Sequence, residues 1–378
     1  MYKLNQIKLN IYHSDEDFKK KIAKTAGVSV ADIDWSTLII LHKSIDARDK
    51  NNILFVYNIA FDFVGASSTS PQIKRLKNKL EKYEPVKFNP YKLCEKNVGK
   101  DKINYVGAST ASPKVLATNG IRPIVVGFGP AGIFASYIFA LNGLKPITIE
   151  RGKSLDDRIK DVDKFFKTME LDEESNVCFG EGGAGAFSDG KLNTNNKDKT
   201  GIYHFILETF VKFGADERIL YENMPHIGTD KLVGVIKNMR NEIIKLGGEI
   251  HYNTKLKFEN GLASFAPTII KDTPIVLAIG NSSRDTFREL IENGFDLKAK
   301  PFAIGYRIAH GQLLINEAQY GGARKTRPYM GSTSIRPYED KLGPATYKLT
   351  YDVGNGHSVY SFCMCPGGYI INSSNYKG

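Results

Sequence analysis

The stretch PIVVGFGPAGIFAS, residues 123–136, decides the fold of the longest part of this chain. Its apolar start predicts a buried strand, and the segment from Ile133 to Leu141 predicts a helix. Between them stand three glycines with different roles. Gly127 permits a tight turn, Gly129 lets a pyrophosphate approach the backbone, and Gly132 lets the helix pack on the strand. This order predicts a βαβ unit that binds a dinucleotide.

An acidic residue stands at the position that such a unit requires. Residues 146–149 predict a second strand, which ends at Glu150, about twenty residues after the last glycine. A carboxylate there accepts hydrogen bonds from ribose hydroxyls but repels a ribose 2′-phosphate, so we do not expect NADP at this site. The helix N-terminus offers free amide hydrogens and its positive dipole end to the phosphates.

Two later segments favour FAD over NAD as the dinucleotide. Residues 179–192 form a second glycine-dense loop, whose amides would approach phosphate or flavin and whose Lys191 would face negative charge. A plain NAD dehydrogenase is not expected to carry such a loop there. Residues 273–280 predict another parallel strand that ends in Gly280 and returns to the ligand crevice.

Composition places few other limits on the chain. It has 378 residues, 42% hydrophobic and 25% charged, which is long enough for two or three globular domains. The net charge of +11 is typical of lysine-rich solvated faces as much as of an anionic partner. Four unevenly spaced cysteines and no signal pattern favour a reducing cytoplasm. Glycines interrupt the apolar stretch 121–144, so no membrane helix is expected.

The first 88 residues predict a separate ferredoxin-like α+β sandwich. Residues 4–11 alternate as a half-buried strand, and Ser14 with Asp17 forms a capping box ahead of a helix that ends near Gly27. Two strands follow at 37–41 and 53–63, and a helix is expected over 71–83. Residues 89–120 are polar and aperiodic, which predicts a linker.

The basic face of that last helix suggests a rival function, a flavin-binding protein that associates with or modifies RNA. The face carries four lysines: Lys74, Lys77, Lys79 and Lys82. The strand at residues 52–57, however, lacks the glycines and the basic start of an RNA-binding strand, and a lysine-rich helix face is usually only solvated. We therefore do not expect a nucleic-acid partner.

Several blocks together resemble the uncharacterised FAD-dependent dehydrogenases of bacteria, relatives of the glutathione-reductase-like flavoproteins. The blocks are GFGPAGIFAS (127–136), IERG (149–152), CFGEGGAGAFSDGKL (178–192), VLAIGNSSRDTF (276–287), KPFAIGYRIAH (300–310), ATYKLT (345–350) and SFCMCPGG (361–368), and KSIDARDK (43–50) also fits. The resemblance implies that FAD is held by Gly127, Gly129, Pro130, Ala131, Gly132, Glu150, Arg151, Gly182, Gly183, Ser188 and Gly280.

The sequence departs from that family in two places, and its catalytic residues are hard to recognise. Asn281 stands where the family usually has histidine, and the stretch from Leu256 to Pro274 is shorter than the usual β-meander. Flavin itself performs the redox chemistry, so few catalytic side chains are expected. The candidates are His310, Lys348 and Cys363, with Tyr347 beside them, while the Cys363-x-Cys365 pair is too closely spaced for an unstrained disulfide.

We therefore expect an α/β protein with a Rossmann-like FAD-binding domain at 121–294. A β-rich substrate domain follows at 295–378, and we expect it to be incomplete because no late glycine-aspartate segment follows Cys365. The predicted reaction is hydride transfer between flavin and an organic small molecule or NAD(P)H, the latter bound only transiently. No metal is expected, and the sequence gives no indication of substrate or oligomeric state.

Overall fold

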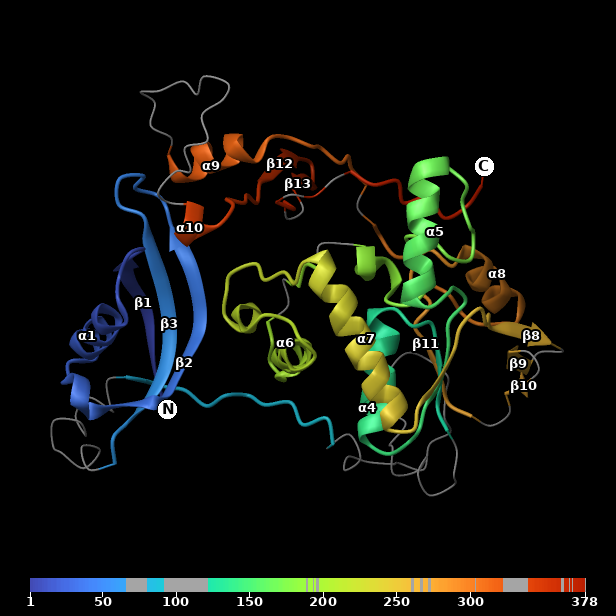
Figure 1. Cartoon of the computed structure of the whole chain (residues 1–378), viewed down its shortest axis with the longest axis horizontal. Coiled ribbons are helices and arrows are strands. Elements are labelled where there is room, and N and C mark those ends of the chain that lie inside the picture. Colours follow the sequence, from blue (N-terminus) through green and yellow to red (C-terminus); the bar gives the residue numbers. More distant parts are fainter. Residues whose placement is uncertain are drawn as a thin grey trace. The chain divides into compact units, whose positions relative to one another are not determined.

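The structure is a computed structural model that describes most of the chain. It covers residues 1–65, 80–91, 122–187, 190–192, 194, 197–259, 262–265, 268–270, 273–302, 304–321, 339–361, 364–366, 368 and 370–377. The chain divides into two compact units (Figure 1). The first unit comprises Met1–Val86, Arg218–Pro225 and Tyr306–Ile370, and the second comprises Lys87–Glu217, His226–Gly305 and Ile371–Gly378.

The first unit is built on an antiparallel sheet with strand order β2-β3-β1-β4. Helix α1 covers one face of this sheet and contributes Ile22, Ala23 and Ala26 to the core (Figure 1). The elements are β1 (Tyr2–Asn10), α1 (Asp15–Ala26), the 3-10 turn η1 (Val30–Asp32), β2 (Ile33–Asp46), β3 (Leu54–Phe63) and β4 (Glu81–Lys82).

Local sequence signals account for the start of this unit. The Ser14 hydroxyl accepts from the Asp17 amide at 3.1 Å, and the Asp17 carboxylate accepts from the Ser14 amide at 3.0 Å, as the capping box predicts. Gly27 ends α1 in the left-handed conformation, with φ of 75°. Ile7 and Leu9 of β1 are buried, which confirms the predicted alternation.

Long-range pairing changes two of the predicted elements. Strand β2 runs from Ile33 to Asp46, far beyond the predicted 37–41, because it pairs along the length of β3. The predicted end of the last helix is wrong, since Glu81 and Lys82 form β4 and pair with Lys3 and Tyr2 of β1. Residues 71–79 lie outside the described part of the chain.

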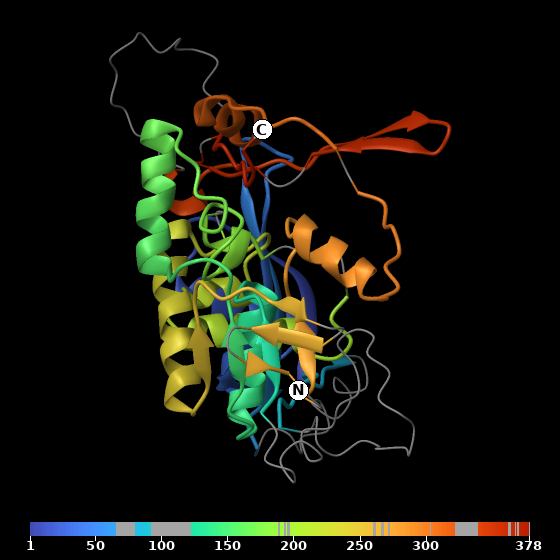
Figure 2. The same ribbon diagram turned by 90° about the vertical axis from the view of Figure 1, so that its right-hand side faces the viewer.

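The later residues of the first unit add two helices and a hairpin. Tyr320, Leu342 and Ala345 are buried in the same core as β1 and β3. The structure therefore groups most of the predicted substrate domain with the N-terminal residues, and the described part of that domain contains the two strands of one hairpin. The elements are α9 (Gln312–Tyr320), α10 (Glu339–Leu342), β12 (Thr350–Gly354) and β13 (His357–Tyr360), the last two forming the red hairpin in Figure 2.

The second unit contains a parallel sheet with strand order β11-β5-β6-β7. Beside it lies a three-stranded antiparallel sheet, β10-β9-β8. The strands are β5 (Ile124–Val126), β6 (Ile147–Ile149), β7 (Glu249–His251), β8 (Lys257–Glu259), β9 (Leu262–Phe265), β10 (Thr268–Ile269) and β11 (Ile275–Leu277). The helices are α4 (Pro130–Leu141), α5 (Leu155–Thr168), α6 (Ile202–Lys212), α7 (Thr229–Lys245) and α8 (Arg284–Glu292), with 3-10 turns η4 (Gly183–Phe187) and η5 (Glu217–Leu220).

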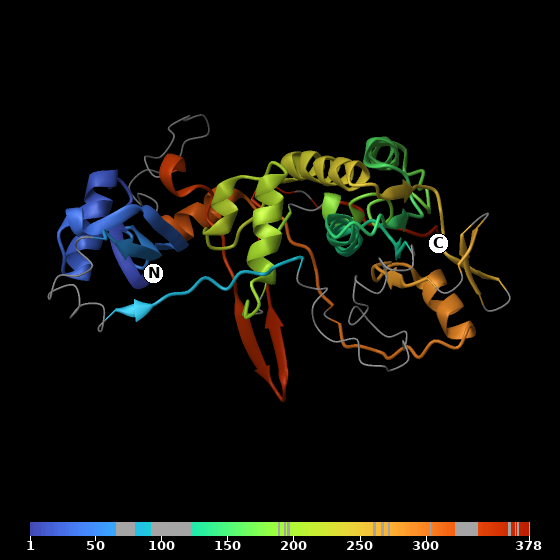
Figure 3. The ribbon, with the colours of Figure 1, turned by 90° about the horizontal axis from the view of Figure 1, so that it is seen from below.

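The parallel sheet is covered on both faces. Toward α4, the Thr148 hydroxyl and the Ser136 hydroxyl share a hydrogen bond of 2.8 Å, and α7 packs against α4 (Figures 1 and 3). On the opposite face, alternate strand residues pack with the residues of the small antiparallel sheet and its flanks. That core consists of Ile124, Val126, Ile149, Leu256, Phe265 and Ile270. Two-sided burial explains why the inner strand β5 is apolar and buried at every position, whereas the edge strand β7 carries Glu249 and His251.

No helix in the described residues is long and apolar enough to cross a membrane.

Candidate functional site

The turn between β5 and α4 depends on two glycines. Gly127 has φ of 95°, and a Cβ there would lie 2.5 Å from the carbonyl oxygen of Ala278. A Cβ on Gly132 would lie less than 3.0 Å from the carbonyl oxygen of Gly127, closer than real Cβ atoms approach a backbone. The tight turn and the close helix packing that the sequence predicts are therefore present.

Gly129 has a different neighbour from the one we expected. A Cβ at this position would point at the backbone of Gly183, 3.6 Å from its Cα. The second glycine-rich loop thus lies directly against the first. A glycine at 129 lets the two loops approach, and its predicted contact with a pyrophosphate remains a prediction.

The N-terminus of α4 presents backbone amides. Its first bonded amide is that of Ile133, which donates to the carbonyl of Gly129 at 2.9 Å. The amides of Gly129, Ala131 and Gly132 precede this bond, and among the described residues they have no acceptor. Pro130 stands at the first helical position, where it has no N–H to offer. Such a helix end attracts anions.

Glu150 lies at the end of β6, buried to 5% exposure. Its Oε1 accepts the amides of Gly152 at 2.9 Å and Gly180 at 3.0 Å, and its Oε2 accepts the amide of Phe128 at 2.7 Å. One carboxylate therefore joins both glycine-rich loops to the end of β6. Each carboxylate oxygen has two acceptor sites, so Oε2 keeps one for a further donor.

The second glycine-rich loop completes this region together with the end of β11. The Gly182 amide donates to the carbonyl of Phe128 at 2.8 Å. Gly280 follows β11 with φ of 70°, and no atom would lie within 4 Å of a Cβ there. Ser188 lies outside the described residues. The carboxyl ends of β5, β6 and β11 thus meet at one edge, where ligands of open parallel sheets bind.

Arg151 forms a clamp beside this edge. Its guanidinium contacts the carboxylate of Glu174 at 2.7 and 2.9 Å and that of Asp285 at 2.9 and 3.0 Å. Lys255 also donates to Asp285, at 2.6 Å. Burial alone would raise the pKa of Asp285, but the hydrogen bonds from Arg151 and Lys255 outweigh it and hold that pKa well below 3.8. The cofactor contact predicted for Arg151 remains a prediction.

Sequence analysis missed a buried polar cluster behind the second loop. Arg158 of α5 and Glu181 are both fully buried. Glu181 Oε2 accepts the amide of Leu155 at 2.7 Å and the guanidinium of Arg240 at 2.8 Å. The hydroxyl of Tyr252 lies beside the side chains of Glu181 and Arg240. The sequence contained one signal, because Arg158 lies on the stripe of α5 that includes Leu155 and Val162.

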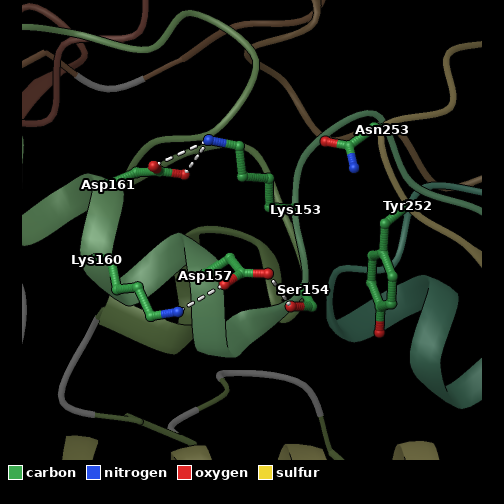
Figure 4. A pocket seen from close by; sticks show the side chains of 7 residues that line it. All are labelled: Lys153, Ser154, Asp157, Lys160, Asp161, Tyr252 and Asn253. Atoms are coloured by element: carbon green, nitrogen blue, oxygen red, sulfur yellow. Dashed lines mark hydrogen bonds and ion pairs between the residues drawn. The ribbon is translucent and has the colours of Figure 1, made fainter.

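A shallow polar hollow of about 440 Å³ lies at the start of α5 (Figure 4). Its charged side chains are paired with one another: Lys153 with Asp161 at 2.9 Å, and Lys160 with Asp157 at 2.8 Å. Glu150 does not line it. The lining residues are Lys153, Ser154, Asp157, Lys160, Asp161, Tyr252 and Asn253. Because its charges are internally balanced, this hollow has no net charge with which to attract a cofactor phosphate.

Of the candidate catalytic residues, His310 and Lys348 lie in the first unit. His310 Nε2 lies 3.0 Å from the hydroxyl of Tyr347, a pairing that the sequence did not predict. Lys348 is exposed. Cys363 lies outside the described residues, and Cys365 is a free, exposed thiol. Within the described ranges, no group of His, Cys, Asp and Glu side chains is arranged to hold a metal ion.

Two family models match parts of the chain. Residues 301–378 match the model described as "FAD-dependent protein, C-terminal domain-like", and residues 1–62 match a domain of unknown function, DUF8436. The first match supports an FAD-dependent family for this chain.

Two known proteins are also similar to it. A protein of Clostridium beijerinckii described as "Uncharacterized protein" is 39% identical over 383 residues, in an alignment that covers all of this chain and 64% of the relative. The chain therefore spans less than two thirds of that relative's length. The L-amino acid deaminase of Proteus vulgaris is 14% identical, with a TM-score of 0.29, over 45% of this chain and 56% of the deaminase. A likeness this weak supports no conclusion.

Proposed function

We propose that the second unit is a Rossmann-like domain that binds the ADP part of FAD, and that the protein acts as an FAD-dependent oxidoreductase. One observation carries this proposal. The free amides at the start of α4, the carboxylate of Glu150 and the open backbone at Gly280 lie at the same end of parallel strands.

The residues at this edge fit the chemistry of an adenosine diphosphate. The amides of Gly129, Ala131 and Gly132 would bind the pyrophosphate, assisted by the positive end of the α4 dipole. The remaining acceptor site on Glu150 Oε2 would take a ribose hydroxyl. Because that carboxylate is negative, a ribose 2′-phosphate would be repelled, so the site favours FAD over NADP.

Bound FAD supplies two-electron redox chemistry through its isoalloxazine. This chain's own residues would bind it and position it. His310, paired with Tyr347, and Lys348 are the candidates for proton donation or anion contact with a small organic substrate, together with Cys363. NAD(P)H would act as a transient co-substrate, and the expected compartment is the cytoplasm. The first unit would be a ferredoxin-like sandwich, in keeping with its strand order β2-β3-β1-β4.

Reconstitution with FAD tests the oxidoreductase proposal. The purified chain is incubated with FAD, desalted and exposed anaerobically to NADH, NADPH and a panel of reduced organic compounds. The proposal expects the visible flavin band to be retained after desalting and to bleach with at least one reductant. A retained flavin that no reductant bleaches would support a cofactor site without dehydrogenase activity, whereas loss of all flavin on desalting would contradict the cofactor site.

A further inference from the structure

Arg158 is a fully buried cation whose hydrogen bonds all go to one loop. Its guanidinium donates to four backbone carbonyls: Asn176 at 2.8 Å, Val177 at 2.9 Å, Gly180 at 3.2 Å and Glu181 at 2.6 Å. The guanidinium also lies 4.8 Å from the centre of the Phe187 ring. One side chain of α5 therefore fixes the start of the second glycine-rich loop.

These bonds determine which way the loop amides point. In a planar trans peptide, the carbonyl and the following N–H point in opposite directions. The carbonyl of Glu181 points to Arg158, and accordingly the amide of Gly182 points away from it and donates to Phe128 of the first loop at 2.8 Å. The same holds one residue earlier, where the Glu181 amide donates to Lys153 at 3.1 Å.

Two glycines outside the βαβ turn make this arrangement sterically feasible. A Cβ on Gly180, which has φ of 113°, would lie 2.5 Å from Cδ of Arg158. A Cβ on Gly152 would lie 2.6 Å from the backbone of Gly180. Gly180 therefore allows Arg158 to pack against the loop, and Gly152 allows the loop to pack against the residues that follow β6. Close packing of protein groups accounts for both glycines without a phosphate contact.

The hydrogen bonds of Arg158 and Glu150 meet at the second glycine-rich loop. Glu150 accepts the amides of Phe128 and Gly180, while Arg158 donates to the carbonyls of Gly180 and Glu181. The contact between Gly182 and Phe128 joins the two sets. An anion-binding edge built from backbone amides depends on such a fixed frame, because mobile amides lose entropy on binding.

Arg158 keeps its positive charge despite its burial. Burial lowers the pKa of Arg158 to about 10, and the neighbouring Glu150, Cys178 and Glu181 oppose that effect. Arg158 therefore remains protonated at neutral pH. A cation with planar, forked donors is required here, because a lysine ammonium offers three donors from a single nitrogen and does not span four carbonyls.

We propose that Arg158 is a positioning residue for the cofactor: it orients the Gly180–Gly183 backbone against the phosphate loop and so completes the FAD site. This inference rests on the proposed function. It assigns a role in FAD affinity to a side chain that lies behind the loops, on α5, without requiring the side chain to touch the cofactor.

The test compares Arg158→Lys with a matched control, Arg122→Lys. Arg122 also bonds a loop carbonyl, that of Lys145 at 2.7 Å, but it lies at the amino end of β5, away from the crevice. Isothermal titration with FAD should show affinity at least about tenfold weaker in R158K, the equivalent of one charge-assisted hydrogen bond, and unchanged within about twofold in R122K. Amide exchange in the FAD-free R158K variant should accelerate in residues 176–187 and not in β5 or α4.

Several results would decide against this role. Normal FAD affinity in R158K would overturn it while leaving the proposed function standing. Accelerated exchange throughout the second unit would show that Arg158 only supports the fold. Absence of FAD binding by the unmodified chain would overturn the proposed cofactor site and this inference with it. If R158K does not fold, amide exchange is measured in the unmodified, FAD-free protein instead. The proposal expects the Gly182 amide to exchange as slowly as the amides of β5. Rapid exchange of the Gly182 amide would refute the role.

Discussion

The backbone N–H of Phe128 donates a hydrogen bond of 2.7 Å to Oε2 of Glu150. This bond joins the loop that leaves β5 to the acid that ends β6. The position of the acid, predicted from sequence as a ribose acceptor, therefore also fixes the loop that would hold the pyrophosphate. Loss of the Glu150 carboxylate should affect both parts of an adenosine diphosphate site.

The first prediction concerns Glu150 directly. Glu150→Ala should weaken FAD binding by at least about tenfold, because the ribose loses its acceptor and three amides lose theirs. Free FMN lacks the adenosine ribose, and its weaker binding should change by no more than about twofold. Parallel titrations of the variant with FAD and FMN measure this difference. Equal losses for the two flavins would contradict a ribose contact.

A second prediction contrasts two glycines of the same turn. Gly132→Ala should destabilise the second unit by about 1–3 kcal/mol, because its Cβ would press on the Gly127 carbonyl in a packed turn. Gly129→Ala should cost less than about 1 kcal/mol, since its Cβ would meet Gly183 at an ordinary distance of 3.6 Å. Chemical denaturation followed by circular dichroism measures both, and equal destabilisation would show that the turn relaxes around Gly132.

A larger residue at position 129 should abolish FAD binding without unfolding the first unit. Gly129→Val places further carbon atoms against Gly183 and should displace the second glycine-rich loop. We expect FAD to be absent from the purified variant while the antiparallel sheet of the first unit remains folded. Amide exchange in β1 and β3 provides the folding control. Full FAD occupancy in the variant would refute the placement of the phosphates at this turn.

A further prediction follows from the clamp between Arg151 and Asp285. The pKa of Asp285 is lower in the folded protein than its ordinary value of 3.8, which applies to the unfolded chain. The ionised carboxylate therefore stabilises the fold fully above about pH 4, and this stabilisation is lost as the pH falls toward the pKa of the folded protein. Asp285→Asn should therefore lower stability by about 1–2 kcal/mol at pH 7. The difference from the unmodified protein should shrink below about pH 4.

Thermal melts at pH 7 and at decreasing pH measure this effect. Asp296→Asn is the control, because Asp296 lies 4.0 Å from Lys298 with a side chain that is 83% exposed. It should leave the melting temperature nearly unchanged at every pH. A gap between D285N and the unmodified protein that stays constant down to about pH 3 would show that the Asp285 charge does not contribute through its lowered pKa.

Sequence alone was sufficient for the parts of the fold that depend on neighbouring residues. The strand, turn, helix, strand and acid of residues 124–150 appear in the predicted order, because apolar runs and glycine spacing encode them locally. The capping box at Ser14 appears for the same reason. The strand at 275–277 also pairs in parallel with β5, as predicted.

Features that depend on distant residues were not predictable in the same way. Glu81 and Lys82 become a strand only because the edge of β1 is available to pair with them. Ala345 is buried in the core of the first unit, far from its sequence neighbourhood. No local pattern shows that residues 306–370 belong with the first 86 residues.

In the candidate site, too, the residues close in sequence were predictable and the contacts between distant residues were not. Gly127, Gly132 and Glu150 were recognisable from their spacing. The two carboxylates that pair with Arg151 come from residues 174 and 285, so sequence analysis had no reason to connect them. Arg158 resembled one of many surface charges on an amphipathic helix, and only its place on the buried stripe distinguished it.

The measurement that tests the central claim most directly is competition at the FAD site of the unmodified chain. FAD is titrated into the protein by isothermal calorimetry, alone and in the presence of excess ADP or riboflavin. The account predicts one FAD per chain, displaced by ADP and little affected by riboflavin, because the βαβ edge recognises the adenosine diphosphate part. FAD binding that ADP does not displace, or no binding at all, would contradict the assignment of this edge as the cofactor site.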